Sequence, residues 1–211
     1  MKNIHGHRTP SGKEKEGKAG RSGILNSTCP GIILLLCLFL AQCGGLPHRD
    51  SRNDNGVNSF PYSSGHEYRA QIRSLQKELA ALDKGVSDEE ALLVADAAFR
   101  VSLSLANEYN LVRPPLYHNF LVNLGIKKRG LCIHWTRDLL KNLRRLDQKS
   151  FHFYWAVANR EFPLIIHSSV VVTARNQPFE EGLVLDPWRN SGRLYWIPVK
   201  ADRYPWQKEI L

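Results

Sequence analysis

The order in which helical and strand-like patterns occur along the chain restricts its fold more than any other feature. Up to about residue 146, apolar side chains recur at three- and four-residue steps, which predicts amphipathic helices. From residue 151 onward, the chain consists of short segments rich in β-branched and aromatic residues, separated by Asn, Pro and Gly. Helices followed by strands predict an α+β fold, with N-terminal helices packed on a C-terminal antiparallel sheet.

The boundaries of these elements are marked by capping and breaking residues. Ser87 to Glu90 has the pattern of a capping box, and Pro114 with Pro115 separates two helices. No internal repeat is present, so a single folded domain is expected over residues 66–211. We expect helices at 66–84, 87–110, 116–124 and 132–146, and strands at 151–157, 164–173, 182–185 and 193–199.

An uncharged apolar run at residues 31–41 separates this domain from a basic leader. A run of this length fits the apolar region of a signal peptide and is short for a spanning helix, which needs about 20 residues. The leader before it has no apolar period, and its Lys and Arg outnumber its acidic residues. Together these features predict that the chain is exported.

Residues 40–43, Leu-Ala-Gln-Cys, resemble the lipobox of bacterial lipoproteins, in which the Cys is the first mature residue. The resemblance implies that residues 1–42 are a signal peptide and that Cys43 carries acyl chains as a membrane anchor facing the periplasm or the outside of a bacterial cell envelope. Gln42 stands where the family has Gly, Ala or Ser, so an uncleaved signal anchor is the alternative. Residues 43–65, which contain Gly, Asn, Ser and Pro, are expected to form a flexible tether.

The net charge of +9 does not by itself indicate a nucleic-acid partner. Residues 1–42 hold six of the 29 basic residues and two of the 20 acidic ones, so the rest of the chain carries +5. No pattern of basic residues interleaved with aromatic ones occurs in that part. We therefore expect no nucleic-acid partner.

Cys132 is the free thiol that remains once the leader is set aside and Cys43 is assigned to lipid. An unpaired Cys in an exported protein is a candidate nucleophile. Cys132 opens the fourth predicted helix, where unsatisfied backbone N–H groups and the helix dipole favour the thiolate. No Cys-x-x-Cys or His-Glu-x-x-His spacing is present, so no metal site is expected.

A thiol nucleophile needs a base and a third group that orients the base. His167 lies in an apolar strand pattern, and Asp186 ends the next predicted strand, just before Pro187. Adjacent antiparallel strands would set the two side chains next to each other. His134 is a rival base, but residues two apart on a helix point to different sides, which disfavours a pair with Cys132.

These residues resemble the motifs of the transglutaminase-like superfamily, which has a papain-like fold. The resemblance covers about residues 117–206 and rests on Arg-Gly-Leu-Cys-Ile-His-Trp at 129–135, His167 in its strand, and Val-Leu-Asp-Pro-Trp at 184–188 followed by Ser-Gly-Arg-Leu-Tyr-Trp at 191–196. It implies a papain-like core in which Cys132 is the nucleophile, His167 the base and Asp186 the orienting group.

The oxyanion hole is expected to combine the backbone N–H of Cys132 with one upstream side chain. The candidates are Asn119 and Asn123, with His118 as a further possibility. Chemistry of this kind requires no cofactor.

The expected function is that of a membrane-anchored, extracytoplasmic thiol enzyme that acts on amide bonds by acyl transfer. The partners are the lipid bilayer, through Cys43, and a protein or peptidoglycan peptide as substrate. Hydrolysis by water and transamidation by an amine both remain open, as does the oligomeric state. The alternative is a non-catalytic envelope lipoprotein that uses the same scaffold for binding. The basic loop at 127–129 would attract an acidic substrate, or is simply solvated.

Overall fold

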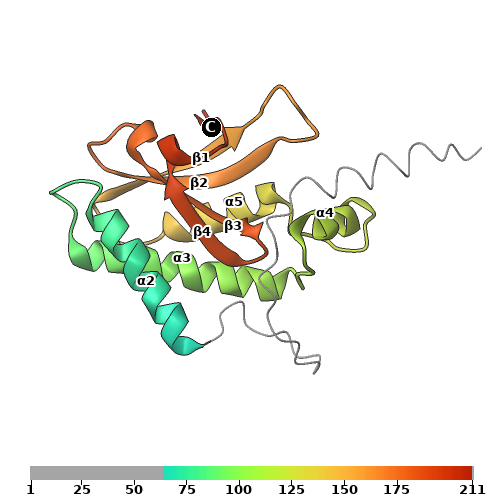
Figure 1. Cartoon of the computed structure of the whole chain (residues 1–211), viewed down its shortest axis with the longest axis horizontal. Coiled ribbons are helices and arrows are strands. Elements are labelled where there is room, and N and C mark those ends of the chain that lie inside the picture. The colour runs from blue at the N-terminus through green and yellow to red at the C-terminus, as the bar shows by residue number, and fades with distance from the viewer. Residues whose placement is uncertain (1–63, 211) are drawn as a thin grey trace, which may run out of the picture. The chain divides into compact units, whose positions relative to one another are not determined.

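The helices and strands occur in the predicted order in the computed structural model, which describes residues 64–210 (Figure 1). Within these residues the α-helices are α2 (Gly65–Ala80), α3 (Asp88–Glu108), α4 (Pro115–Asn123) and α5 (Cys132–Leu143). The strands are β1 (Phe151–Ala158), β2 (His167–Ala174), β3 (Leu183–Asn190), β4 (Arg193–Pro198) and β5 (Gln207–Lys208). Short 3-10 turns lie at Phe179–Glu181 and Val199–Ala201.

All five strands form one sheet in the order β4-β3-β2-β1-β5, and every neighbouring pair is antiparallel. The predicted α+β class with an antiparallel sheet is therefore confirmed. The two-residue β5, which pairs with β1 near its end, was not predicted, because a segment this short carries no alternating pattern.

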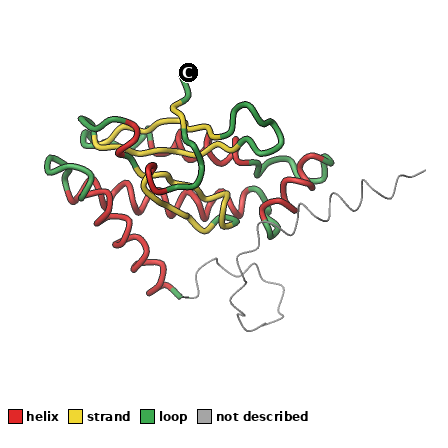
Figure 2. Tube along the Cα trace, turned by 45° about the horizontal axis from the view of Figure 1, so that its top comes forward, coloured by secondary structure: helices red, strands yellow, loops and turns green. Residues whose placement is uncertain are grey.

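Alternate residues of the sheet are buried on opposite faces, as the period of two in a strand requires. Val170 and Val172 pack with Leu75 of α2, Phe99 of α3 and Leu139 of α5 in the main core. Figures 1 and 2 show these helices lying along the sheet as a separate layer.

The other face of the sheet is covered by the connection between β2 and β3 and by the C-terminal segment rather than by α-helices. Val171 and Val184 pack there with Phe179 and Trp206, while Tyr204 contributes at the margin. Because both faces are covered, all eight residues of β2 are buried. This central strand carries His167 at its first position.

Two strand predictions need correction. Residues Leu164 to Ile166 were expected to begin a strand, but they form an exposed loop, and β2 begins at His167. The loop is closed by turn hydrogen bonds, including one from Phe162 N to Asn159 O at 2.9 Å and one from Ile165 N to Phe162 O at 3.0 Å. An apolar β-branched run alone does not separate a buried strand from an exposed loop.

The second correction concerns Asp186, which does not end its strand. β3 continues to Asn190, and Asp186 is paired with Tyr195 of β4 before a shift of register. The β2–β3 ladder does stop at Leu185, just before Pro187, which has no N–H to donate. Beyond Leu185, β3 is therefore no longer paired with β2 but is still paired with β4.

The predictions for the N-terminal part fall largely outside the described residues. These are the signal peptide at 1–42, the lipid anchor at Cys43, and all but the last two residues of the tether at 43–65. Ser64 caps α2 by accepting a hydrogen bond from Glu67 N at 3.1 Å, so the helix begins one residue before the predicted domain boundary. None of the helices within residues 64–210 has the length and hydropathy of a membrane-spanning segment.

Candidate active site

Cys132 is the first residue of α5, and its side chain is partly exposed. Its backbone N–H belongs to the first turn, where helical N–H groups lack partners within the helix. The preceding Gly130 is held by Trp135, whose Nε1 donates to the Gly130 carbonyl at 2.9 Å. The start of α5 is thereby fixed against its own second turn.

A buried histidine on α4 holds the same loop from the other side. His118 Nδ1 accepts a hydrogen bond from Val112 N at 3.2 Å, so Nε2 carries the proton and donates to Arg129 O at 2.8 Å. Gly130 packs against this ring with a φ of +121°, and a Cβ at that position would lie 2.1 Å from His118 Nε2. Only glycine meets both requirements, which explains the Gly before the Leu-Cys pair.

His134, the rival base, is turned back onto the backbone. Its Nδ1 accepts hydrogen bonds from Gly130 N at 3.1 Å and Leu131 N at 3.2 Å. Burial, followed by the nearby Arg129 and Arg137, lowers the pKa of His134, which keeps it neutral and able to accept. His134 therefore caps the start of α5 and is not available as a base for the thiol.

The structure brings His167 and Asp186 into direct contact. His167 Nε2 lies 2.7 Å from Asp186 Oδ2, and both side chains are almost fully buried. They belong to the same face of the sheet as Val171 and Val184, because strand residues two apart share a face. The pairing of β2 with β3 therefore accounts for the contact.

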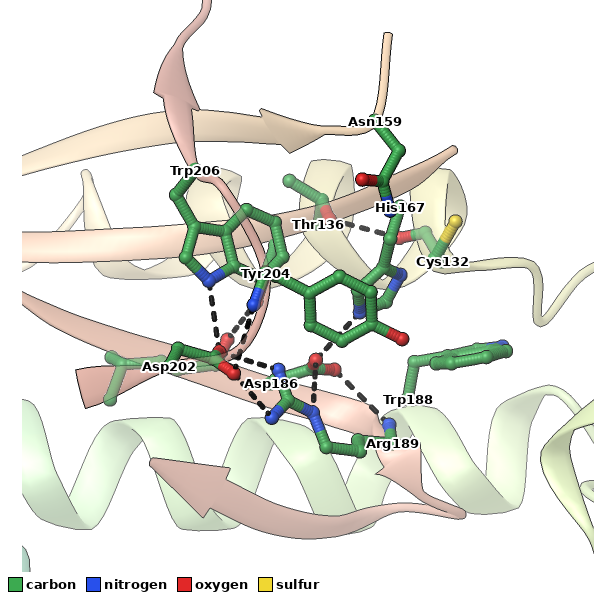
Figure 3. A network of polar contacts seen from close by, with 12 residues as sticks. Cys132, Thr136, Asn159, His167, Asp186, Trp188, Arg189, Asp202, Tyr204 and Trp206 are labelled. Carbon is green, nitrogen blue, oxygen red and sulfur yellow. Dashed lines mark hydrogen bonds and ion pairs between the residues drawn. The ribbon is translucent and has the colours of Figure 1, made fainter. Parts of the chain in front are cut away.

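Three aromatic rings enclose the imidazole of His167. The ring centroids of Trp188, Tyr204 and Trp206 lie 4.7, 5.0 and 5.4 Å from that of His167. Because this cage excludes water, it strengthens the electrostatic interactions of the ring. Figure 3 shows the imidazole between Asp186 on one side and Cys132 on the other.

The charges around His167 favour its protonated form. Burial lowers the pKa of the imidazole, but the Asp186 carboxylate, by charge and by hydrogen bond, and a hydrogen bond with Cys132 outweigh burial and raise the pKa to about 9. Since Nε2 is bonded to Asp186, the ring nitrogen left for Cys132 is Nδ1. Of the three residues predicted as a triad, His167 and Asp186 are in direct contact, and Cys132 contributes to the raised pKa of His167.

Asp186 is held by a second cation that the sequence analysis did not identify. Arg189 donates from its backbone N to Asp186 Oδ1 and from Nε to Asp186 Oδ2, both at 3.1 Å. Burial raises the pKa of Asp186, but His167 and then Arg189 outweigh burial and lower it, so the carboxylate stays ionised. An Arg three residues after an Asp on a bulged strand gives no sequence signal of this contact.

Arg189 is in turn fixed by Asp202, which lies beyond β4. The two guanidinium NH groups donate to the two carboxylate oxygens at 3.1 and 2.7 Å, and Trp206 Nε1 donates to Asp202 Oδ2 at 2.9 Å. The guanidinium also lies over the rings of Tyr195 and Tyr204. Figure 3 follows this line of alternating charges from His167 through Asp186 and Arg189 to Asp202.

The two predicted oxyanion candidates differ in their relation to this cluster. Asn119 Oδ1 accepts a hydrogen bond from Trp188 Nε1 at 3.0 Å, which links it to the cage around His167 and leaves its two N–H groups as donors. Asn123, one turn further along α4, is exposed, and no contact with the cluster is found for it among the described residues. Both ring nitrogens of His118 form hydrogen bonds with backbone groups, so His118 has no ring N–H left to donate to an oxyanion.

The basic loop at 127–129 does not act as one patch. Arg129 forms an ion pair with Asp138, which also accepts a hydrogen bond from Tyr109 Oη at 2.6 Å. Lys127 Nζ donates to Asn110 O at 2.8 Å, while Lys128 is exposed. Arg129 and Lys127 therefore hold the loop that precedes Cys132 in the chain.

A hollow of about 780 Å³ lies away from this cluster, beside residues 151–155 of β1. Its basic lining includes Arg144, Arg175 and Lys208, of which the two arginines each donate a hydrogen bond to a backbone carbonyl. None of Cys132, His167 or Asp186 lines it. Within residues 64–210, no group of three His, Cys, Asp or Glu side chains has an arrangement that could hold a metal ion.

Comparison of the chain with family models, with curated proteins and with solved structures finds no match.

Proposed function

We propose that this protein is a thiol enzyme that transfers acyl groups from amides, with Cys132 as nucleophile, His167 as acid and base, and Asp186 as the group that orients His167. The observation that carries the proposal is the buried His167, which is bonded to Asp186 through Nε2, has its pKa raised to about 9, and has Cys132 on its other side in Figure 3. An imidazolium next to a thiol at a helix start favours the thiolate, which is the reactive form.

The proposed reaction has two steps. The Cys132 thiolate attacks the amide carbonyl carbon, the C–N bond breaks as His167 gives its proton to the leaving amine, and a thioester forms. A water molecule or a second amine then attacks the thioester, neutral His167 takes its proton, and the thiolate is released. The Cys132 N–H and Asn119 are the proposed donors to the oxyanion in both steps. Water as acceptor gives hydrolysis, and an amine gives transamidation.

The same proposal includes the fold family and the cellular location. Cys132 at a helix start, His167 on the sheet and Asp186 on the next strand support a transglutaminase-like, papain-like core. The lipobox-like residues 40–43 support a lipoprotein anchored through Cys43 in a bacterial envelope. Protein side chains or peptidoglycan peptides are then the proposed substrates, with no nucleic acid and no cofactor involved.

Acylation of the full chain with p-nitrophenyl acetate tests the catalytic part. We expect one acetyl group on the peptide that contains Cys132, detected by mass spectrometry, together with a burst of nitrophenolate. Cys132→Ser should abolish both signals, and His167→Ala should slow them by about a hundredfold or more. Equal acetylation of wild type and His167→Ala would favour the alternative, a non-catalytic lipoprotein that binds through the same scaffold.

A further inference from the structure

Most of the large apolar side chains that the described domain exposes lie at one end of it (Figure 1). Of twelve such exposed residues within 64–210, ten belong to α4 and the turn after it, the first turn of α5, and the loop between β1 and β2. Figures 1 and 2 both place α4 and the β1–β2 loop at the same end of the domain. We call these ten residues the apolar rim.

The helical part of the apolar rim is an amphipathic face turned outward. On α4, Leu116, Phe120 and the C-cap Leu124 follow one another at four-residue steps, and Tyr117 lies beside them, all exposed. The one buried residue of α4 is His118. A helix in a folded domain normally buries its apolar stripe, so this helix lacks a partner for its stripe in the described domain.

The second part of the apolar rim is the β1–β2 loop. Phe162, Leu164, Ile165 and Ile166 are all exposed, and Leu164 is 97% exposed. Turn hydrogen bonds form within the loop, and it leads directly into His167. Ile133, next to Cys132, is exposed as well. The apolar rim therefore includes residues that adjoin Cys132 and His167 in the chain.

The charges near the apolar rim are basic. Residues 111–128, which contain α4, include Arg113, Lys127 and Lys128 and no acidic residue. Glu161 is the acidic residue of the β1–β2 loop. Apolar side chains that project beside exposed Lys and Arg are typical of surfaces that insert into the interface of an anionic bilayer.

The part of the chain before the described domain favours a bilayer as the partner of the apolar rim. The apolar run ends at Ala41, and 22 residues, 42–63, connect it to the described domain. Fully extended, these residues reach about 75 Å at most, so a chain held in a membrane by its leader or by Cys43 keeps the domain near that membrane.

We propose that the apolar rim docks on the surface of an anionic bilayer and brings Cys132 to amides carried at that surface. The inference rests on the membrane location in the proposed function. It adds a substrate class, namely amides displayed by lipid-anchored or membrane-proximal molecules rather than freely diffusing ones.

Flotation of the released domain tests the docking. A protease site is inserted between residues 44 and 63 of the full chain, the folded chain is cut, and the purified domain is mixed with protein-free vesicles of phosphatidylcholine and phosphatidylglycerol. We expect the wild-type domain to float with these vesicles, less so in high salt. Leu164→Glu combined with Phe120→Glu should reduce the bound fraction about tenfold or more.

Leu92→Glu is the matched control, because Leu92 is exposed on α3 and lies outside the apolar rim. It should bind as wild type does, with all variants giving wild-type circular dichroism. Three results would overturn the proposal. The wild-type domain could stay in solution, it could self-associate through the apolar rim, or it could remain bound to its leader fragment in detergent. Equal loss in Leu92→Glu would do so as well. Cys132→Ser should float as wild type does, because docking does not need the thiol. Flotation therefore tests docking independently of the catalytic proposal.

Discussion

At the scale of single residues, the central feature is a buried imidazolium between a carboxylate and a thiol. The sequence analysis placed His167 next to Asp186, because the order of the two residues and their strands are visible as patterns, and these two side chains are in contact. It did not predict the cage of Trp188, Tyr204 and Trp206, or the role of Arg189, because contacts made by a bulge and a C-terminal segment leave no periodic signal.

The raised pKa of His167 makes stability depend on pH. The folded pKa of about 9 lies above the ordinary value of 6.5, so the stabilisation is fully present below about pH 6.5 and is lost as pH rises through about 9. The pKa difference corresponds to at most about 3 kcal/mol. Urea unfolding of the wild-type chain in a reducing buffer at several pH values measures it.

Asp186→Asn in the same buffer provides the comparison, because it removes the charge that raises the pKa of His167. The loss of stability between pH 6.5 and 9 should then largely disappear. A decline of the same size with and without the carboxylate would contradict the pairing of His167 with Asp186.

At the scale of elements, the helix boundaries were predictable to within a few residues, since caps and breakers mark them. The start of β2 and the end of β3 were not, because the exposed run 164–166 and the strand through Pro187 depend on tertiary neighbours. The site lies at these two places, where β2 begins and β3 bends.

The start of α5 depends on Gly130. Gly130→Ala should lower the free energy of unfolding by about 3 kcal/mol or more, because a Cβ there would overlap His118 and the φ of +121° is unfavourable for alanine. The alkylation rate of Cys132 should fall with it. Gly125→Ala is the control: its φ is +74°, but no atom lies within 4 Å of a Cβ at that position, so the cost should be about 1 kcal/mol. Similar losses in both variants would contradict the packing of the loop against His118.

The ion pair of Arg189 with Asp202 ties the bend of β3 to the C-terminal segment. Asp202→Asn should lower the free energy of unfolding by about 3 kcal/mol, because it leaves a largely buried guanidinium with one fewer anionic partner. Glu181→Gln removes an exposed pair with Lys200 and should change stability by less than about 0.5 kcal/mol. Chemical unfolding of both variants decides whether the two ion pairs differ as expected.

At the scale of the whole molecule, the α+β class and the antiparallel sheet both followed from the order of the helices and strands along the chain. The exposed apolar rim did not follow from the sequence. Leu116, Phe120 and Leu124 form the same periodic stripe that a buried helix face would have, and only the three-dimensional neighbours decide whether it is covered.

Attachment to the membrane is tested by metabolic labelling of the full chain with palmitate. Wild type should carry the label, and Cys43→Ser should not, because Cys43 is the proposed acceptor of the acyl chains. Cys132→Ser should keep the label, which separates the anchor from the candidate nucleophile. Label that survives Cys43→Ser would refute lipidation at this position and favour the uncleaved signal anchor.

The pH dependence of Cys132 alkylation by iodoacetamide tests the central claim most directly, read in the full chain by mass spectrometry of the peptide that contains Cys132. We predict that wild type stays reactive near pH 6, where an isolated thiol with a pKa of about 8.5 reacts slowly, and that His167→Ala reacts like that isolated thiol. An inert Cys132, or the same pH profile in wild type and His167→Ala, would contradict the account.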